Sequence, residues 1–157
     1  MKVRRLWMAA VFGLAAAWLA APLPAAAKGN DDEVFQQEAV RQINGFRASE
    51  KRGPVTLDPA LNALASEWAA KLAHEGEMEH RSMGNMRTLL SSHGWSALNE
   101  NLFMSSAPSA SPSEVIAAWK ESTGHRRNLL QGNITRIGIG TAAGKAGFFV
   151  VFNGAGG

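Results

Sequence analysis

The end of the chain carries the pattern that most limits the folds open to it. The stretch RIGIGT (136–141) alternates, with its two isoleucines on one face, and GFFVVFN (147–153) is rich in β-forming residues. The linker between them contains Gly144 and predicts a β-hairpin. Gly138 and Gly140 leave the face opposite the isoleucines nearly bare. Another element or a ligand can therefore come close to the backbone there.

Two amphipathic helices are predicted earlier in the chain, over about residues 32–49 and 59–75. Asp58 is a favourable N-cap for the second helix, because Pro59 follows it at the first helical position. Gly76 is the expected C-terminal stop. We expect Trp68 on the buried stripe of this helix, and each apolar stripe needs a partner surface.

The middle of the chain is predicted to be mixed. We expect a short helical turn over 86–91, a strand over 99–105 and a third helix over 112–119. Together with the C-terminal hairpin, these elements predict an α+β fold. In it a small antiparallel sheet has helices on both faces, which buries every apolar stripe.

The N-terminus has the layout of a secretory signal. A basic start (MKVRR) precedes an apolar run (LWMAAVFGLAAAWLA), and AAA at 25–27 offers a small-residue cleavage site. We therefore predict a signal peptide over 1–27, a disordered lead-in over 28–33 and one domain over 34–157. The apolar run is short for a membrane helix, so no stable span is expected after cleavage. The protein is predicted to be secreted or periplasmic, with an uncleaved anchor as the alternative.

Charge and cysteine content exclude several classes of function. Three of the 16 basic residues lie in 1–27, so 13 basic and 13 acidic residues remain in the mature chain. This balance gives no support for nucleic-acid binding, which requires a basic domain surface. The absence of cysteine excludes thiol catalysis, cysteine-ligated zinc and a lipoprotein anchor. The sequence gives no indication of oligomeric state.

His125 is placed by its context in the first turn of a helix. The helical pattern that leads to Trp119 breaks at residues 122–124, and Ser122 is a favourable N-cap for a new helix at Thr123. The positive end of the helix dipole disfavours a cation there, so we expect a neutral imidazole. Such an imidazole can bind a metal or act as a base, and simple packing is the alternative.

His80 and Glu100 are also expected at the ends of regular elements, where scaffolds display functional groups. With His125 they have the composition of a metal site with open positions. The same three residues are equally suited to general acid–base catalysis. Composition alone does not separate these roles from structural ones, such as capping a helix or holding a loop.

Five motifs occur in order over about residues 34–153: INGFRASEKRGPVTLDPALNALASEWAAKLA, EHRS, GW followed by NENL, AAWKESTGHRRNLLQGNITRIGIG, and FFVVFN. In this order they resemble the CAP superfamily, the SCP-like extracellular domain, in its short bacterial secreted form. The resemblance implies a three-layer α–β–α sandwich with a central cleft.

The resemblance also implies the cleft residues, because family members carry two histidines and two acidic residues there. His80 in EHRS, Glu100 in NENL and His125 in GHRR match three of these positions. They are the candidate ligands for Zn²⁺ or another divalent metal. Ser122 stands where many members have the second acid, so its neighbour Glu121 is the candidate for that place. No catalytic residue is assigned.

Three functions are compatible with the CAP resemblance and its candidate cleft residues. The expected one is a binding module whose cleft holds a small apolar or envelope-derived ligand, with or without a divalent metal. The alternative is a metal-assisted, peptidase-like hydrolase of the cell envelope. The chain has no cysteine and no G-x-S-x-G motif, so this enzyme would need a metal-activated water. The third is a structural interaction protein of the envelope, in which the three side chains only hold the fold together.

Overall fold

The predicted C-terminal hairpin forms the centre of the sheet. The structure, a computed structural model, describes residues 26–157, with side chains from residue 31. The sheet has the order β1-β3-β4-β2. The hairpin strands β3 and β4 and the outer strand β2 are antiparallel neighbours, whereas β1 runs parallel to β3. The strands are β1 (Thr56–Leu57), β2 (Ala97–Ser105), β3 (Arg136–Gly144) and β4 (Gly147–Gly156).

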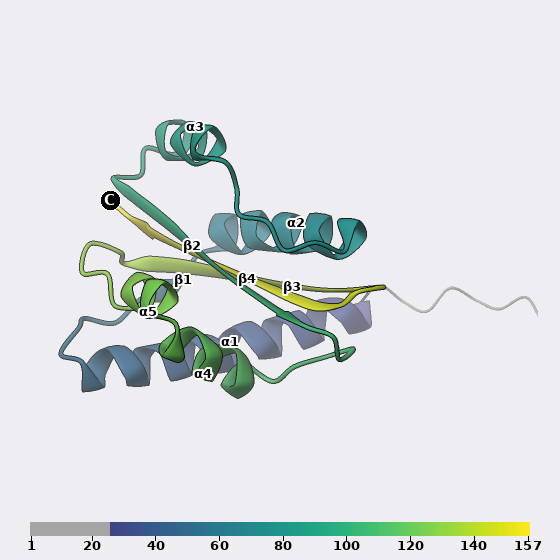
Figure 1. Ribbon diagram of the computed structural model, residues 1–157. Coiled ribbons are helices and arrows are strands. Elements are labelled where there is room, and N and C mark those ends of the chain that lie inside the picture. Colours follow the sequence, from purple (N-terminus) through teal and green to yellow (C-terminus); the bar gives the residue numbers. More distant parts are fainter. Residues whose placement is uncertain (1–25) are drawn as a thin grey trace, which may run out of the picture.

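Helices cover both faces of this sheet, which confirms the predicted three-layer α–β–α sandwich (Figure 1). One layer packs an apolar core against the isoleucines of β3. The other layer packs a second core against β2 and β4. The first layer contains α1 (Ala26–Ser49), α4 (Pro112–Glu121) and α5 (Thr123–Leu129), and the second contains α2 (Pro59–Glu75) and α3 (Met83–His93).

Two predictions about the ends and edges need correction. The sheet is mixed rather than antiparallel, because the two-residue strand β1 was not expected. Residues 28–33 are not a disordered lead-in but lie within α1, where Asp32 accepts a hydrogen bond from the hydroxyl of Thr141 on β3. The predicted signal peptide lies outside the described residues except for its last two positions. Within 26–157, no helix is long and apolar enough to cross a bilayer.

The glycines of β3 let α2 lie directly on the strand, as the bare face of the hairpin predicted. A Cβ atom on Gly138 would lie 2.0 Å from the carbonyl carbon of Leu61, and one on Gly140 would lie 2.1 Å from the backbone nitrogen of Ser66. Gly144 meets the backbone of α2 in the same way. Since only hydrogen fits at these positions, the approach of α2 is fixed by sequence.

The termini of α2 are those predicted. The Asp58 carboxylate accepts from the N–H groups of Ala60 and Leu61, and Gly76 ends the helix in the left-handed conformation. Trp68, however, does not lie in the core. It is half-buried at the edge of the stripe, where its indole N–H donates to the carbonyl of Glu79. Small residues take its expected place, because α2 sits too close to β3 for a large side chain between them.

Side-chain amides close the outer edges of the sheet. Beyond the short strand β1, the N–H of Ile139 donates to Asn62 and its carbonyl accepts from Gln36. The two amides also hydrogen-bond to each other at 3.0 Å. On the opposite edge, Asn128 donates to the carbonyl of Glu100, and the indole of Trp119 donates to the carbonyl of Leu102. Side chains thus pair with part of each outer edge, at Ile139 on β3 and at Glu100 and Leu102 on β2.

Candidate functional site

The candidate site is built around a buried carboxylate on the outer strand β2. The Glu100 side chain is only 4% exposed, and the loop after α2 folds over it. Oε1 accepts from Nδ1 of His80 and from the backbone N–H of Arg81, both at 3.0 Å. Oε2 lies 2.6 Å from Nη1 of Arg81 and also accepts from Asn153 at 3.5 Å. The carboxylate is therefore fully occupied by donors.

This arrangement fixes how His80 presents its ring. The Glu100 carboxylate is paired with Arg81 at 2.6 Å, and a carboxylate can only accept, so Nδ1 of His80 is the donor in their contact. The other ring nitrogen, Nε2, then has a free lone pair whenever the imidazole is neutral. The His80 side chain is 59% exposed, so this lone pair is accessible. A carboxylate behind a histidine in this way sets the tautomer and orientation needed for a metal ligand or a base.

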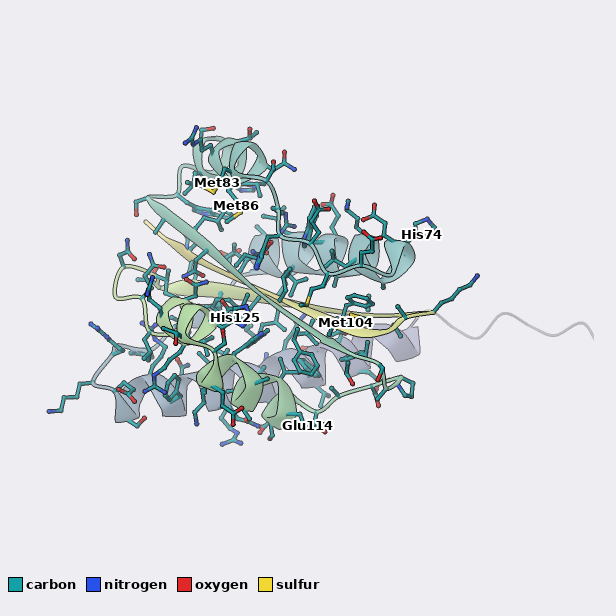
Figure 2. The ribbon with its side chains drawn as sticks, in the orientation of Figure 1. His74, Met83, Met86, Met104, Glu114 and His125 are labelled. Atoms are coloured by element: carbon teal, nitrogen blue, oxygen red, sulfur yellow. The ribbon has the colours of Figure 1, made fainter. Side chains whose placement is uncertain are left out.

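His125 approaches from the other helical layer. It lies in the first turn of α5, which begins at Thr123 as predicted, although Ser122 makes no side-chain cap. The backbone carbonyl of His125 accepts from Asn101, the neighbour of Glu100 on β2. Figure 2 shows His125 at α5, well away from His74 at the outer end of α2.

The electrostatics of His125 link it to His80. Burial lowers the pKa of the His125 imidazole below 6.5, and the nearby charge of His80 lowers it further. The expected neutral form is thus supported, but burial rather than the helix dipole is the main cause. The positive charge of His80 thus disfavours a second positive charge on His125.

Glu121 is not drawn into this arrangement. It is exposed at the last residue of α4 and makes no hydrogen bond or ion pair with residues 31–157. Over the same residues, no group of three His, Asp or Glu side chains is gathered so as to hold a metal ion. Because Glu100 is paired with Arg81 and bonded to His80, its place is that of a carboxylate that orients a histidine, not of a free ligand.

Two contributors to the site were not predicted from the sequence. Arg81 is buried, and its guanidinium joins Glu100 to the carbonyl of Leu64 on α2 at 2.6 Å and to Asn153 on β4 at 3.3 Å. It also lies over the ring of Trp68. The position of Arg81 directly after His80 is the one signal in the sequence. Asn153 lies opposite Glu100 in the register of β2 and β4, which only the strand pairing reveals.

Known proteins share both the sequence motifs and the fold. The sequence profile of the CAP family, described as the cysteine-rich secretory protein family, matches residues 40–153. The chain belongs to this family. It does so without the cysteines of the family's description. The CAP resemblance seen in the motifs is thereby confirmed.

Two Bacillus proteins are similar to this CAP domain. It is 27% identical over 110 residues to the uncharacterized protein YkwD of Bacillus subtilis, covering 68% of this chain and 42% of YkwD. Its fold is similar to that of an extracellular SCP-domain protein from Bacillus anthracis, with a TM-score of 0.72, 18% identity and coverage of 88% of this chain and 45% of the other. This CAP chain therefore spans under half the length of both proteins.

Two further structures share the CAP fold over most of their length. An outer surface protein of Borrelia burgdorferi has a TM-score of 0.65 and 18% identity, over 76% of this chain and 90% of that one. A structure of NaASP2 with Zn²⁺ has a TM-score of 0.58 and 16% identity, over 76% and 78%. At these identities the likeness extends to the fold alone.

Proposed function

We propose that this CAP domain is a binding module outside the cytoplasm, whose cleft at His80 and His125 holds a divalent metal such as Zn²⁺. The observation that carries the proposal is the hydrogen bond from Nδ1 of His80 to the buried Glu100, which leaves Nε2 free on an exposed ring. His125 supplies the second nitrogen. Burial lowers the pKa of this imidazole, which keeps its nitrogen available to a metal at neutral pH.

The protein would provide two ligands and leave the remaining positions of a tetrahedral ion to water or to donors of a bound molecule. Such a metal would polarise or anchor a polar group of an envelope-derived ligand. Glu100 would not touch the metal but would hold the His80 ring in place, as carboxylates commonly do behind ligating histidines. The NaASP2 structure with Zn²⁺ supports the proposal by analogy within the fold.

An extracellular setting is supported by two related structures, one of an extracellular protein and one of an outer surface protein. The signal-like sequence over 1–27 points the same way.

Hydrolysis is the second candidate function, because a carboxylate that orients a histidine also occurs behind general bases. The nearby Ser82 caps α3, where its hydroxyl accepts from the N–H of Asn85.

The test is calorimetric titration of chelator-stripped protein with Zn²⁺ at pH 7.5, on protein purified from cells that express the full chain. We expect saturable binding that is abolished by the double change His80→Ala and His125→Ala. Glu100→Gln should weaken it by about 10- to 100-fold, the usual effect of removing a carboxylate behind a ligating histidine.

The chain provides a matched control, because its other two histidines lie elsewhere. His74 lies in the last turn of α2, and His93 stacks on Trp95 with ring centroids 4.3 Å apart. The double change His74→Ala and His93→Ala should therefore leave Zn²⁺ binding unchanged. Equal affinity in the two double variants would refute the metal site. Loss of folding only in the His80 and His125 variant would instead favour a structural role.

A further inference from the structure

A second candidate site lies beside α5, where the loop that follows this helix meets the turn after α1. An open hollow of about 730 Å³ is found there. It is lined by three arginines, Arg52, Arg126 and Arg127, and no Asp or Glu is among its lining residues. Neither His80 nor His125 is among its lining residues, so it is distinct from the metal site proposed above.

The positive charge of this hollow is only partly compensated. Arg126 pairs with Glu50 at 2.5 Å and lies over the ring of Phe46. Arg52 and Arg127 are exposed, and neither forms an ion pair with any residue in 31–157. In a mature chain whose basic and acidic residues balance, a corner with this excess of arginine is a local feature rather than a reflection of composition.

A fourth, buried arginine adds positive charge next to the hollow. Arg47 on α1 is 1% exposed and donates only to backbone carbonyls, those of Gly53, Leu129 and Gln131. The carbonyls of Gly53 and Gln131 bring the Arg47 guanidinium beside Arg52 and the wall of the hollow. Burial lowers the pKa of Arg47, and the charge of Arg52 lowers it further. An anion in the hollow would offset these positive charges.

Neutral donors complete the lining. Gln131 accepts from Asn99 through Oε1, which leaves both N–H bonds of its amide nitrogen without a partner among the described residues. The hydroxyl of Thr123 is a further potential donor in the same wall. The hollow thus presents donors from the turn after α1, from α5 and from the loop beyond it.

We propose that this hollow binds a phosphate-bearing anion. Guanidinium groups form paired hydrogen bonds with phosphate oxygens, and donors from three segments suit a tetrahedral anion better than a planar carboxylate. The volume exceeds that of one phosphate group, so the phosphate belongs to a larger molecule or to a chain of phosphates. The chemistry is shared by soluble phosphates and by lipid headgroups.

The experiment uses protein purified from cells that express the full chain. Calorimetric titration with tripolyphosphate at pH 7.5 and low salt should show saturable binding. The double change Arg52→Gln and Arg127→Gln should weaken it by about tenfold or more, since charge-assisted hydrogen bonds are lost. Both side chains are exposed, so the fold should persist. If the double variant is unstable, the single change Arg127→Gln should still weaken tripolyphosphate binding, by a smaller factor.

The matched control removes two exposed positive charges elsewhere, through Arg87→Gln on α3 and Lys145→Gln in the hairpin turn. It should bind tripolyphosphate as the unchanged protein does. Flotation with phosphatidylglycerol vesicles, against phosphatidylcholine vesicles, then separates the sources. Arginine-dependent binding to those vesicles assigns a lipid headgroup, and arginine-dependent binding to tripolyphosphate alone assigns a soluble phosphate. Absence of saturable binding to both probes, or an equal loss in the two double variants, would overturn the proposal.

Discussion

Arg81 and Glu100 form a buried ion pair at 2.6 Å, with side chains that are 5% and 4% exposed. The pair joins the loop after α2 to the outer strand, so His80 is held in position by the same contact. Removing one member of such a pair leaves an uncompensated charge in the interior, which costs more than the pair contributes.

We therefore expect Arg81→Met to lower the free energy of unfolding by about 3–5 kcal/mol, measured by urea denaturation. The double variant Arg81→Met with Glu100→Gln should recover part of this loss, because it removes the orphaned carboxylate. A single variant that is as stable as the unchanged protein would show that water reaches Glu100.

Alanine substitutions at two glycines, Gly140 at the contact between α2 and β3 and Gly45 on α1, should have opposite effects on stability. Gly140→Ala places a methyl group 2.1 Å from the backbone of α2, so the helix must move away. Overpacking of this kind costs about 1–3 kcal/mol and more where backbone blocks the space. Gly45→Ala, in the C-terminal part of α1 with nothing within 4 Å of the added atom, should stabilise the fold by about 0.5–1 kcal/mol. Thermal unfolding of both variants checks the pair of predictions.

Two tryptophans, Trp68 and Trp119, differ in burial. Trp119 is 1% exposed and donates its indole N–H to Leu102, so Trp119→Ala should cost about 3–5 kcal/mol. Trp68 is half-buried, and Trp68→Ala should cost clearly less, about 1–2 kcal/mol by the same scale. Urea unfolding that ranks the two variants in the reverse order would contradict the assignment of the core.

The lowered pKa of His125 predicts a pH dependence of stability in metal-free protein. The unfolded chain takes up a proton at about pH 6.5, whereas the folded chain does so only at lower pH. Stability should therefore be full above about pH 6.5 and fall as the pH decreases towards the folded pKa. His125→Gln should remove this part of the slope. NMR titration of the imidazole gives the direct check, and a value above 6.5 would be incompatible with its burial.

Much of the architecture follows from local sequence rules. Asp58 and Gly76 define the ends of α2 because capping depends on the residues at the helix end. Gly138 and Gly140 indicated a close neighbour because a missing Cβ is visible in the sequence. By contrast, β1 has two residues and pairs with a strand that is 80 residues away, Thr56 with Arg136. No local pattern distinguishes it from a loop.

The sequence predicted three residues of the candidate site, but neither their contacts nor the parts that Arg81 and Asn153 play. The motifs indicated His80 and Glu100, and the structure places them in contact. That Glu100 is occupied by Arg81 depends on a loop folding over a strand, which spacing alone does not show. Whether these residues bind a metal stays a prediction. The arginine hollow was not predicted, because Arg52 and Arg127 are 75 positions apart in sequence and meet only through the packing of α5 on α1.

The side chains that bond to the sheet edges affect how the concentrated protein aggregates. A bare outer strand is a template on which a second copy can add its own strand, the first step towards fibrils. Here Gln36 and Asn62 occupy one edge, and Trp119 and Asn128 occupy the other. At the backbone groups of Ile139, Glu100 and Leu102, a second copy therefore meets side chains and not free hydrogen-bonding partners. In the extracellular setting proposed above, beyond the reach of cytoplasmic chaperones, such built-in resistance to aggregation is an advantage.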